Sequence, residues 1–196
     1  MVTTEQIKAL RDETGVSVML CRKALEEAKG DFEKAKVILQ RKGADAAAKK
    51  MGRTLGAGTV AAYIHHSGSV GVLVELSSET DFVSGNEEFK TLARDIAMHV
   101  AAAKPEFLKR EDVTEETLSR AKEVLLKEVE GKPKAMQEKI LEGKLNSFFA
   151  EKILLEQPFV KNPDQTVRSL IENAIQRFGE KIEISRFTRF SVNERP

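Results

Sequence analysis

Two runs of alternating apolar residues lie in the middle of the chain and leave few folds open to it. Val60, Ala62 and Ile64 alternate with their neighbours in the first run, and residues 70–76 alternate in the same way in the second. The turn-forming sequence His-Ser-Gly-Ser at residues 66–69 separates the two runs. A period of two on both sides of a turn predicts a β-hairpin. Because an isolated hairpin is only marginally stable in water, the fold needs a third strand and a covering layer.

A long helix is predicted directly after the hairpin. Apolar residues recur at helical spacing from Phe89 to Val100, and the pattern ends at Pro105. Ser84 and Glu87 have the spacing of a capping box, so we expect them to start this helix.

A second regular helix and a last strand are predicted near the end of the chain. Helical spacing holds over residues 167–178 and stops at Gly179, and a strand-like pattern begins at Lys181. Two less regular helices are predicted over residues 114–130 and 133–152. We therefore expect an α+β core with a small three-stranded antiparallel sheet that helices cover on one face.

The beginning of the chain has a purely helical pattern. Three short helices are predicted, with Gly15, Gly30 and Gly43 at their ends. Because each is too short to be stable alone, we expect them to pack into a three-helix module. Alanine, lysine and glycine then dominate a stretch with no strong apolar period. Alanine favours helix in part of it, but a run with so little to bury is more typical of a solvated linker than of a docked segment. The predicted domains are the module at residues 1–43, the linker at 44–57 and the core domain at 58–196.

The second helix of this module carries an apolar residue on the face opposite its predicted buried stripe. Cys21, Ala24 and Leu25 lie on one helical stripe, which predicts an inert, buried cysteine, whereas Met19 lies almost opposite. If the helix begins at residue 18, Met19 points into solvent in an exposed apolar tip at residues 18–20. The alternative is a frayed first turn that folds back onto the core.

The segment between the second strand and the long helix contains an aromatic residue where a short polar connection is expected. Its sequence is Glu-Thr-Asp-Phe-Val at residues 79–83. The residues themselves favour a turn capped by Asp81, with Phe82 and Val83 buried in the core. The alternative is a rigid loop that presents a carboxylate and an aromatic wedge to a partner.

Composition excludes several classes of function. Lys and Arg number 32 and Asp and Glu 31, so a net charge of +1 does not favour binding to phosphate backbones. Ten Phe, one Tyr and no Trp are typical of core packing rather than of a base-stacking surface. No stretch approaches the ~18 consecutive apolar residues of a membrane span. We expect a protein partner, no direct nucleic acid and no membrane. The single cysteine and the absence of a signal-peptide pattern predict a cytoplasmic location.

No set of residues predicts catalysis. Residues 56–61 formally match a dinucleotide-binding pattern, but such a site needs a strand before it and a helix after it, and here the order is reversed. His65 and His66 are neighbours on a strand and point to opposite faces, so they cannot share a metal ion. His99 has no cysteine or carboxylate cluster at ligand spacing, which favours a structural role. We expect no catalytic residue, no metal and no cofactor, and hence a protein that is not an enzyme.

Four ordered segments, spread over nearly the whole chain, resemble the signatures of the translation elongation factor Ts family, in its short form. They are Leu-Arg-Asp-Glu-Thr-Gly at residues 10–15 with Met19 and Cys-Arg-Lys-Ala-Leu at 21–25, Gly-Val-Leu-Val-Glu-Leu at 71–76 with Thr-Asp-Phe-Val at 80–83, Leu-Leu-Glu-Gln-Pro-Phe-Val at 154–160, and Arg-Phe at 186–187 and 189–190. Four segments at consistent spacing are far more specific than any one of them.

The resemblance implies a guanine nucleotide exchange factor that acts on translation elongation factor Tu during polypeptide chain elongation. It implies that the protein binds the GDP form of that GTPase. Thr80, Asp81, Phe82 and Val83 would reach the nucleotide site, disturb the magnesium ion and the phosphate-side peptide, and so promote GDP release. A passive adaptor and a ribosome-associated binding protein are the alternative functions.

The resemblance also implies how the rest of the chain is used. The N-terminal module would be ubiquitin-associated-like and would dock on the GTPase through Val18, Met19 and Leu20, and two chains would form a homodimer. The family usually has Gly-Met-Met-Asp where this chain has Ser-Val-Met-Leu at residues 17–20, and Asn where it has Ser77. Some short members have a cysteine where Thr188 stands here, so a covalent dimer through the last strand is not available to this protein.

Overall fold

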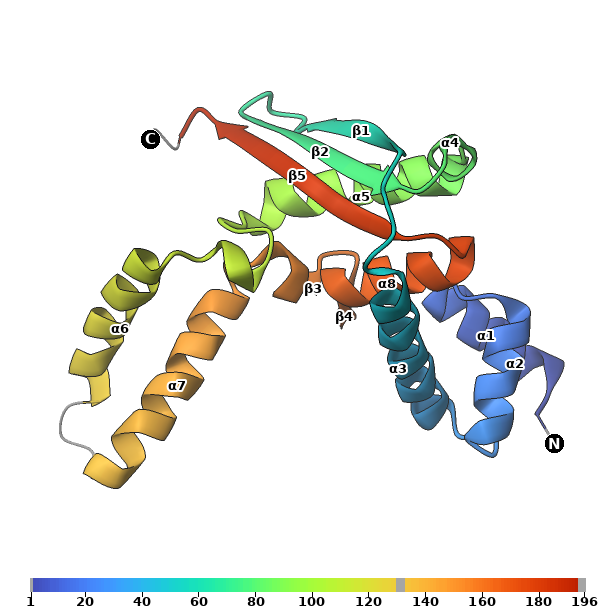
Figure 1. Ribbon diagram of the computed structural model, residues 1–196, viewed down its shortest axis with the longest axis horizontal. Helices are drawn as coiled ribbons and strands as arrows, with labels where there is room; N and C mark the ends of the chain where they lie inside the picture. The colour runs from blue at the N-terminus through green and yellow to red at the C-terminus, as the bar shows by residue number, and fades with distance from the viewer. Residues whose placement is uncertain (1, 130–132, 194–196) are drawn as a thin grey trace.

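A three-stranded antiparallel sheet organises the fold (Figure 1). The structure, a computed structural model, describes residues 2–129 and 133–193. The first strand, β1 (Ala57–Ile64), pairs with β2 (Val70–Ser78), and β2 pairs with β5 (Ile182–Ser191). The strand order is β1-β2-β5. The predicted hairpin, its third strand and the α+β class are therefore confirmed.

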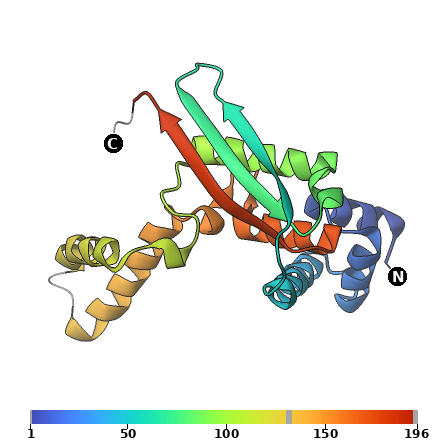
Figure 2. The same ribbon diagram turned by 45° about the horizontal axis from the view of Figure 1, so that its top comes forward.

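Helices cover one face of this sheet (Figure 2). The long predicted helix, α5 (Glu87–Ala103), packs against β1 and β2, and α8 (Val167–Phe178) packs against β5. Inward-facing side chains of strands and helices meet in one buried core. Its larger members include Val72, Val74, Leu76, Phe89, Ile96, Ile171, Ile175, Ile182 and Ile184.

The first residues of α5 differ from the prediction. Asn86 is the N-cap residue, and its side-chain oxygen accepts a backbone hydrogen bond at 2.8 Å. Ser84 instead belongs to a separate helical turn, α4 (Asp81–Ser84), where its hydroxyl donates to the Asp81 carbonyl at 3.3 Å. The predicted capping box of Ser84 and Glu87 is wrong because Ser84 is committed to this earlier turn.

The N-terminal module contains three helices and a core of its own. They are α1 (Thr4–Thr14), α2 (Val18–Glu27) and α3 (Phe32–Lys50). Cys21 is buried in that core, and burial raises the pKa of its thiol, so the group is protonated and unreactive at neutral pH. The other fully buried side chains of this core are Leu10, Val16, Ala24, Leu25, Ala35 and Leu39.

The third helix runs past its predicted end. It does not stop at Gly43 but continues to Lys50, and Ala46 and Ala47 pack against the core of the sheet. The prediction of a solvated linker over residues 44–57 is therefore wrong in its first half. Alanine favours helix, and here the helix finds a surface to pack on, which the sequence pattern does not reveal.

That surface is α8, and the two helices cross closely. Gly43 is buried at the crossing, and Gln176 of α8 donates from Nε2 to the Leu39 carbonyl at 3.0 Å. The crossing fixes the N-terminal module to the rest of the fold.

Gly43→Ala is expected to destabilise the protein, although alanine is the better helix former. A Cβ atom at Gly43 would lie 2.4 Å from Gln176 Nε2, so the amide must move and lose its hydrogen bond to Leu39. The lost bond and the overpacking cost about 2–3 kcal/mol. This exceeds the ~1 kcal/mol that alanine gains over glycine in a helix. Urea denaturation measures the difference.

Gly143→Ala is the matched control, because Gly143 also lies within a helix. None of the described atoms outside its own helix lies within 4 Å of a Cβ atom built there. The control is expected to stabilise the protein by up to about 1 kcal/mol. Equal stabilisation by both changes would contradict the close crossing of α3 and α8.

Two helices project from the body as a pair, at the end opposite the N-terminal module (Figure 1). They are α6 (Glu115–Val129) and α7 (Lys134–Ala150), and both were predicted. A small separate core holds them at their base, formed by Ala121, Phe149 and Ile153.

Short elements complete the chain around this base. They are the 3-10 helices η1 (Arg110–Asp112) and η2 (Leu154–Glu156) and a two-stranded sheet of β3 (Pro158–Phe159) and β4 (Asn162–Thr166). None of the helices in the described part of the chain has both the length and the apolar character needed to cross a bilayer. Glu130, Gly131 and Lys132, at the predicted break between two helices, lie outside the described residues, as do the predicted domain ends Met1 and Pro196.

A buried histidine joins this base to the sheet domain. His99 of α5 is fully buried, its Nδ1 accepts from the Val160 amide at 3.2 Å, and its Nε2 lies 3.0 Å from Gln157 Oε1. Gln157 in turn donates to the Glu151 carbonyl at 2.6 Å, just after α7. Burial lowers the pKa of His99, so the ring is neutral at neutral pH. The predicted structural role of His99 is confirmed.

Candidate functional site

The turn α4 leaves the end of β2 with an aromatic side chain in solvent. Phe82 is 84% exposed, whereas Val83 beside it is 3% exposed and belongs to the core of the sheet. The interpretation that the residues favoured, in which both side chains are buried, is thus wrong for Phe82 and correct for Val83. A four-residue turn can bury only one of these two neighbours, and it buries the valine.

Hydrogen bonds fix the backbone of this turn. The Gly85 amide donates to the Asp81 carbonyl at 2.8 Å, and the Ser78 hydroxyl donates to the Thr80 carbonyl at 2.9 Å. Asp81 is exposed, and no hydrogen bond or ion pair in the described residues engages its carboxylate. The turn therefore presents a ring and an available carboxylate on a held backbone.

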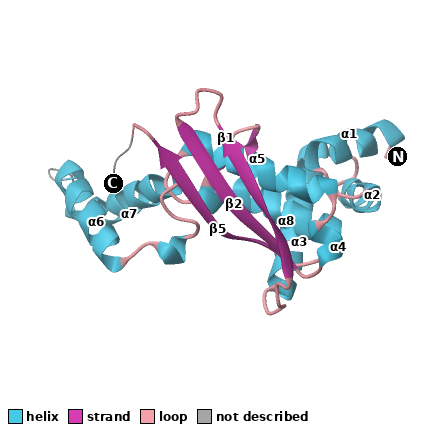
Figure 3. Cartoon of the chain, turned by 90° about the horizontal axis from the view of Figure 1, so that it is seen from above, coloured by secondary structure: helices cyan, strands magenta, loops and turns pink. Residues whose placement is uncertain are grey.

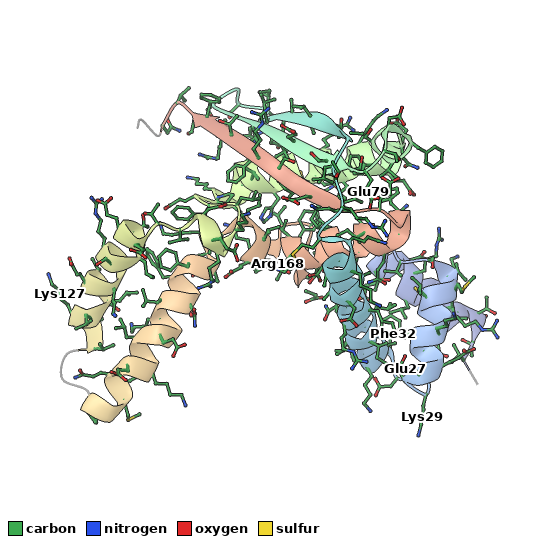
Figure 4. All side chains as sticks on the ribbon, viewed as in Figure 1. Glu27, Lys29, Phe32, Glu79, Lys127 and Arg168 are labelled. Atoms are coloured by element: carbon green, nitrogen blue, oxygen red, sulfur yellow. The ribbon has the colours of Figure 1, made fainter. Side chains whose placement is uncertain are left out.

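Glu79 fastens the start of the turn to a distant part of the chain. It lies between β2 and α4, as Figure 4 shows, and its carboxylate accepts from the Lys181 amide at 2.5 Å and from Arg53 at 3.1 Å. These partners hold the pKa of the Glu79 carboxyl below its ordinary value of 4.5. A depressed pKa stabilises the fold above pH 4.5, and this stabilisation is lost as the pH falls through the lowered value.

The predicted apolar tip is exposed in two of its three residues. The second helix begins at Val18, where the Ser17 hydroxyl accepts from the Leu20 amide at 3.4 Å. Val18 is 54% exposed and Met19 66%, but Leu20 is half-buried and packs against the core of the module. The first turn of α2 does not fold back, so Val18 and Met19 form the tip.

The fold brings these two surfaces to one end of the molecule. Both α4 and the pair α1 and α2 lie at the end opposite α6 and α7 (Figure 3). In the sequence they are about 60 residues apart, and the crossing of α3 with α8 fixes the module that carries the tip. The turn α4 and the tip can therefore face one partner.

Neither surface lines the cavity that lies between α3, α8 and β5. This cavity has a volume of about 370 Å³, and none of the predicted site residues lines it. The described residues contain no group of three or more His, Cys, Asp or Glu side chains that could hold a metal ion.

The apolar character of the outer sheet face is a feature that the sequence pattern did not predict. Val60 and Ile64, which set the alternation of β1, point outward and are 64% and 66% exposed, while Ala61 and Tyr63 face the core. The inward-facing and the outward-facing residues of β1 are both largely apolar, and this pattern was the sequence signal for an apolar outer face. Phe190 of β5 is 70% exposed on the same sheet.

Comparisons with known proteins agree on one family. The model of a family described as Elongation factor TS matches residues 33–194. Elongation factor Ts of Carboxydothermus hydrogenoformans is 53% identical over 196 residues, which cover 99% of this chain and 90% of that protein. Elongation factor Ts of Thermosipho melanesiensis is 48% identical over 99% of this chain and 100% of its own length.

The chain belongs to the elongation factor Ts family. This membership makes it a translation elongation factor. The family match begins within α3, so it includes the turn α4 and leaves out the tip of α2.

One departure from the elongation factor Ts pattern has a structural explanation. Ser77 is 6% exposed in β2, and its hydroxyl lies 2.7 Å from the hydroxyl of Ser185 in β5. The buried polar group is satisfied across the strand pair, so a smaller residue than asparagine is accommodated there without an unpaired atom.

Proposed function

We propose that this protein is a guanine nucleotide exchange factor for elongation factor Tu. The observation that carries the proposal is the exposed ring of Phe82 on a turn whose backbone is held by hydrogen bonds. Interfaces use aromatic side chains as anchors, and a ring held in solvent on a fixed backbone is available for that use. Membership of the elongation factor Ts family supplies the partner.

The mechanism is a difference in binding affinity. A factor that forms no covalent bond speeds GDP release only if it binds the GTPase more tightly once magnesium and phosphate contacts are broken. An acceleration of ~10⁴ corresponds to a barrier about 5.5 kcal/mol lower. Phe82 wedges into the partner and Asp81 disturbs the groups that hold magnesium. When GTP enters and restores these contacts, the factor dissociates.

The N-terminal module supplies binding energy that offsets this distortion. In this proposal the module is ubiquitin-associated-like and docks on the GTPase through Val18 and Met19, with Leu20 supporting them from the module core. The exposed fractions of Val18 and Met19, 54% and 66%, leave apolar area to bury.

Release of a fluorescent GDP analogue from elongation factor Tu tests the proposed function. The release rate is expected to rise with the concentration of this protein and then to saturate. A passive adaptor would bind, as calorimetry would detect, without changing the rate. A ribosome-associated protein would sediment with ribosomes in the absence of elongation factor Tu. Either of these results without faster release would overturn the proposal.

We further propose a homodimer, formed through the outer face of the sheet. Leu73 and Val192 are 46% and 71% exposed and extend the apolar surface of Val60, Ile64 and Phe190. A patch of this kind on a sheet face is typical of an interface. The association is non-covalent, because the single cysteine of the chain is buried in the module.

Phe190→Glu is expected to convert the dimer to monomer. The unmodified protein should have a mass in solution of twice 21.8 kDa, with or without reductant, because no disulfide links the chains. The charged side chain would have to be buried in the apolar contact, at a cost of several kcal/mol. Val124→Glu, on an exposed residue of α6, is the control and should leave the mass unchanged. A monomeric unmodified protein at tens of micromolar would contradict the dimer.

A further inference from the structure

Two carboxylates continue the β2–β5 pairing beyond its last residues. The ladder ends with Ser78 opposite Ile182. In the same register, Glu79 comes opposite Lys181 and Thr80 opposite Glu180. Backbone hydrogen bonds between the two segments have ended there. Instead, a side-chain carboxylate of each segment accepts from a backbone amide of the other. The Glu79 carboxylate accepts from the Lys181 amide at 2.5 Å, and the Glu180 carboxylate accepts from the Thr80 amide at 3.0 Å.

Glu180 holds Thr80 at two points. One of its carboxylate oxygens accepts from the Thr80 amide, and the other accepts from the Thr80 hydroxyl at 2.6 Å. Thr80 is the N-cap residue of α4 but makes no side-chain cap bond, and its hydroxyl donates to Glu180 instead. The amide and hydroxyl of Thr80 are thus held by the segment between α8 and β5, while its carbonyl accepts from Ser78 and from the Ser84 amide of the turn.

The two bonds by which Glu180 holds Thr80 form a clamp. The segment that carries Glu180 is itself fixed. Glu180 follows Gly179, which ends α8 in the left-handed conformation at φ 73°. Arg177 in the last turn of α8 forms an ion pair with Glu88 at the start of α5. On the other side, Lys181 donates from Nζ to the Met51 carbonyl at 3.0 Å. The clamp therefore connects α4 to parts of the fold that are held independently of it.

We propose that Glu180 is a positioning residue for nucleotide exchange, because its two bonds to Thr80 set the direction in which α4 presents Phe82. This inference rests on the proposed function. Glu180 does not touch the partner in this account and acts through Phe82, two residues beyond Thr80. Loss of the clamp removes one of several constraints on α4, so the ring stays exposed but its direction is less restricted and fewer encounters place it correctly.

Hydrogen exchange at the Thr80 amide tests the clamp in the free protein. Glu180→Ala is expected to speed this exchange roughly threefold to tenfold, the effect of losing one solvent-accessible hydrogen bond. Glu180→Gln should restore much of the protection, because its amide oxygen can accept from the Thr80 amide and its NH₂ can donate to the hydroxyl. Glu183→Ala is the control, since the structure pairs that carboxylate with Lys181 Nζ at 3.4 Å and not with Thr80. An unchanged Thr80 amide in Glu180→Ala would overturn the clamp, whatever the protein does to GDP release.

GDP release from elongation factor Tu tests the positioning role. Glu180→Ala is expected to lower the maximal release rate roughly threefold to tenfold and to change the half-saturating concentration less than about twofold. Glu180→Gln should recover most of the rate. In a Phe82→Ala background, Glu180→Ala should have no further effect, since the ring it positions is gone. An equal loss in both backgrounds would contradict action through Phe82. If Phe82→Ala alone leaves release unchanged, the proposed role of Phe82 fails, while the hydrogen-exchange result still decides the clamp.

Discussion

Phe82→Ala is expected to lower the stimulation of GDP release by about tenfold to a hundredfold. Burial of a phenylalanine at the centre of an interface contributes about 1.5–3 kcal/mol. Each 1.4 kcal/mol corresponds to about a factor of ten in rate or affinity. The ring is 84% exposed in the free protein, so its removal should not affect folding. Stopped-flow fluorescence with a labelled GDP measures the change.

Val124→Ala is the control for this experiment. Val124 is 63% exposed in α6, at the other end of the molecule, and its truncation should leave release unchanged. Asp81→Ala should act in the same direction as Phe82→Ala, because the available carboxylate is lost. If Phe82→Ala and Asp81→Ala proteins both stimulate release as well as the unmodified protein, α4 is not the exchange surface.

Met19→Asp is expected to raise the half-saturating concentration about tenfold to a hundredfold, with a smaller effect on the maximal release rate. The apolar contact is lost and a charge would be buried in its place. Folding should tolerate the change, because the first turn of α2 contains no acidic residue and an aspartate there interacts favourably with the helix dipole. Titration of the release rate against protein concentration measures both parameters.

Val37→Asp is the matched control within the same module. Val37 is 63% exposed in α3, so it tests whether any new charge on the module weakens binding. We expect it to bind as the unmodified protein does. If Met19→Asp leaves the half-saturating concentration unchanged, the tip of α2 is not a docking surface.

The sequence predicts the parts of the fold that local pattern determines. The period of two around the turn at residues 66–69 is confirmed as a hairpin, and the stripe from Phe89 to Val100 is confirmed as a helix. Both depend on side chains close in sequence. The end of α3 was missed because it depends on a surface supplied by α8, more than 100 residues away.

The candidate site shows the same division between what local sequence pattern determines and what contacts with distant residues determine. The segment at residues 79–83 stands out in the sequence because an aromatic residue occupies a short connection, but its pattern cannot decide which of Phe82 and Val83 is buried. The positions of β2 and α5 decide that. Glu180 could not be identified from the sequence at all, since only the pairing of β2 with β5 brings it to Thr80.

The dependence of GDP release on magnesium tests the central claim most directly. Release from elongation factor Tu is measured with and without saturating amounts of this protein, first in magnesium and then after a chelator has removed it. If α4 acts by disturbing the magnesium and phosphate site, chelation removes the magnesium contacts before the protein binds. The stimulation of GDP release by the protein should then fall by at least about tenfold. The same stimulation in both conditions would contradict the account.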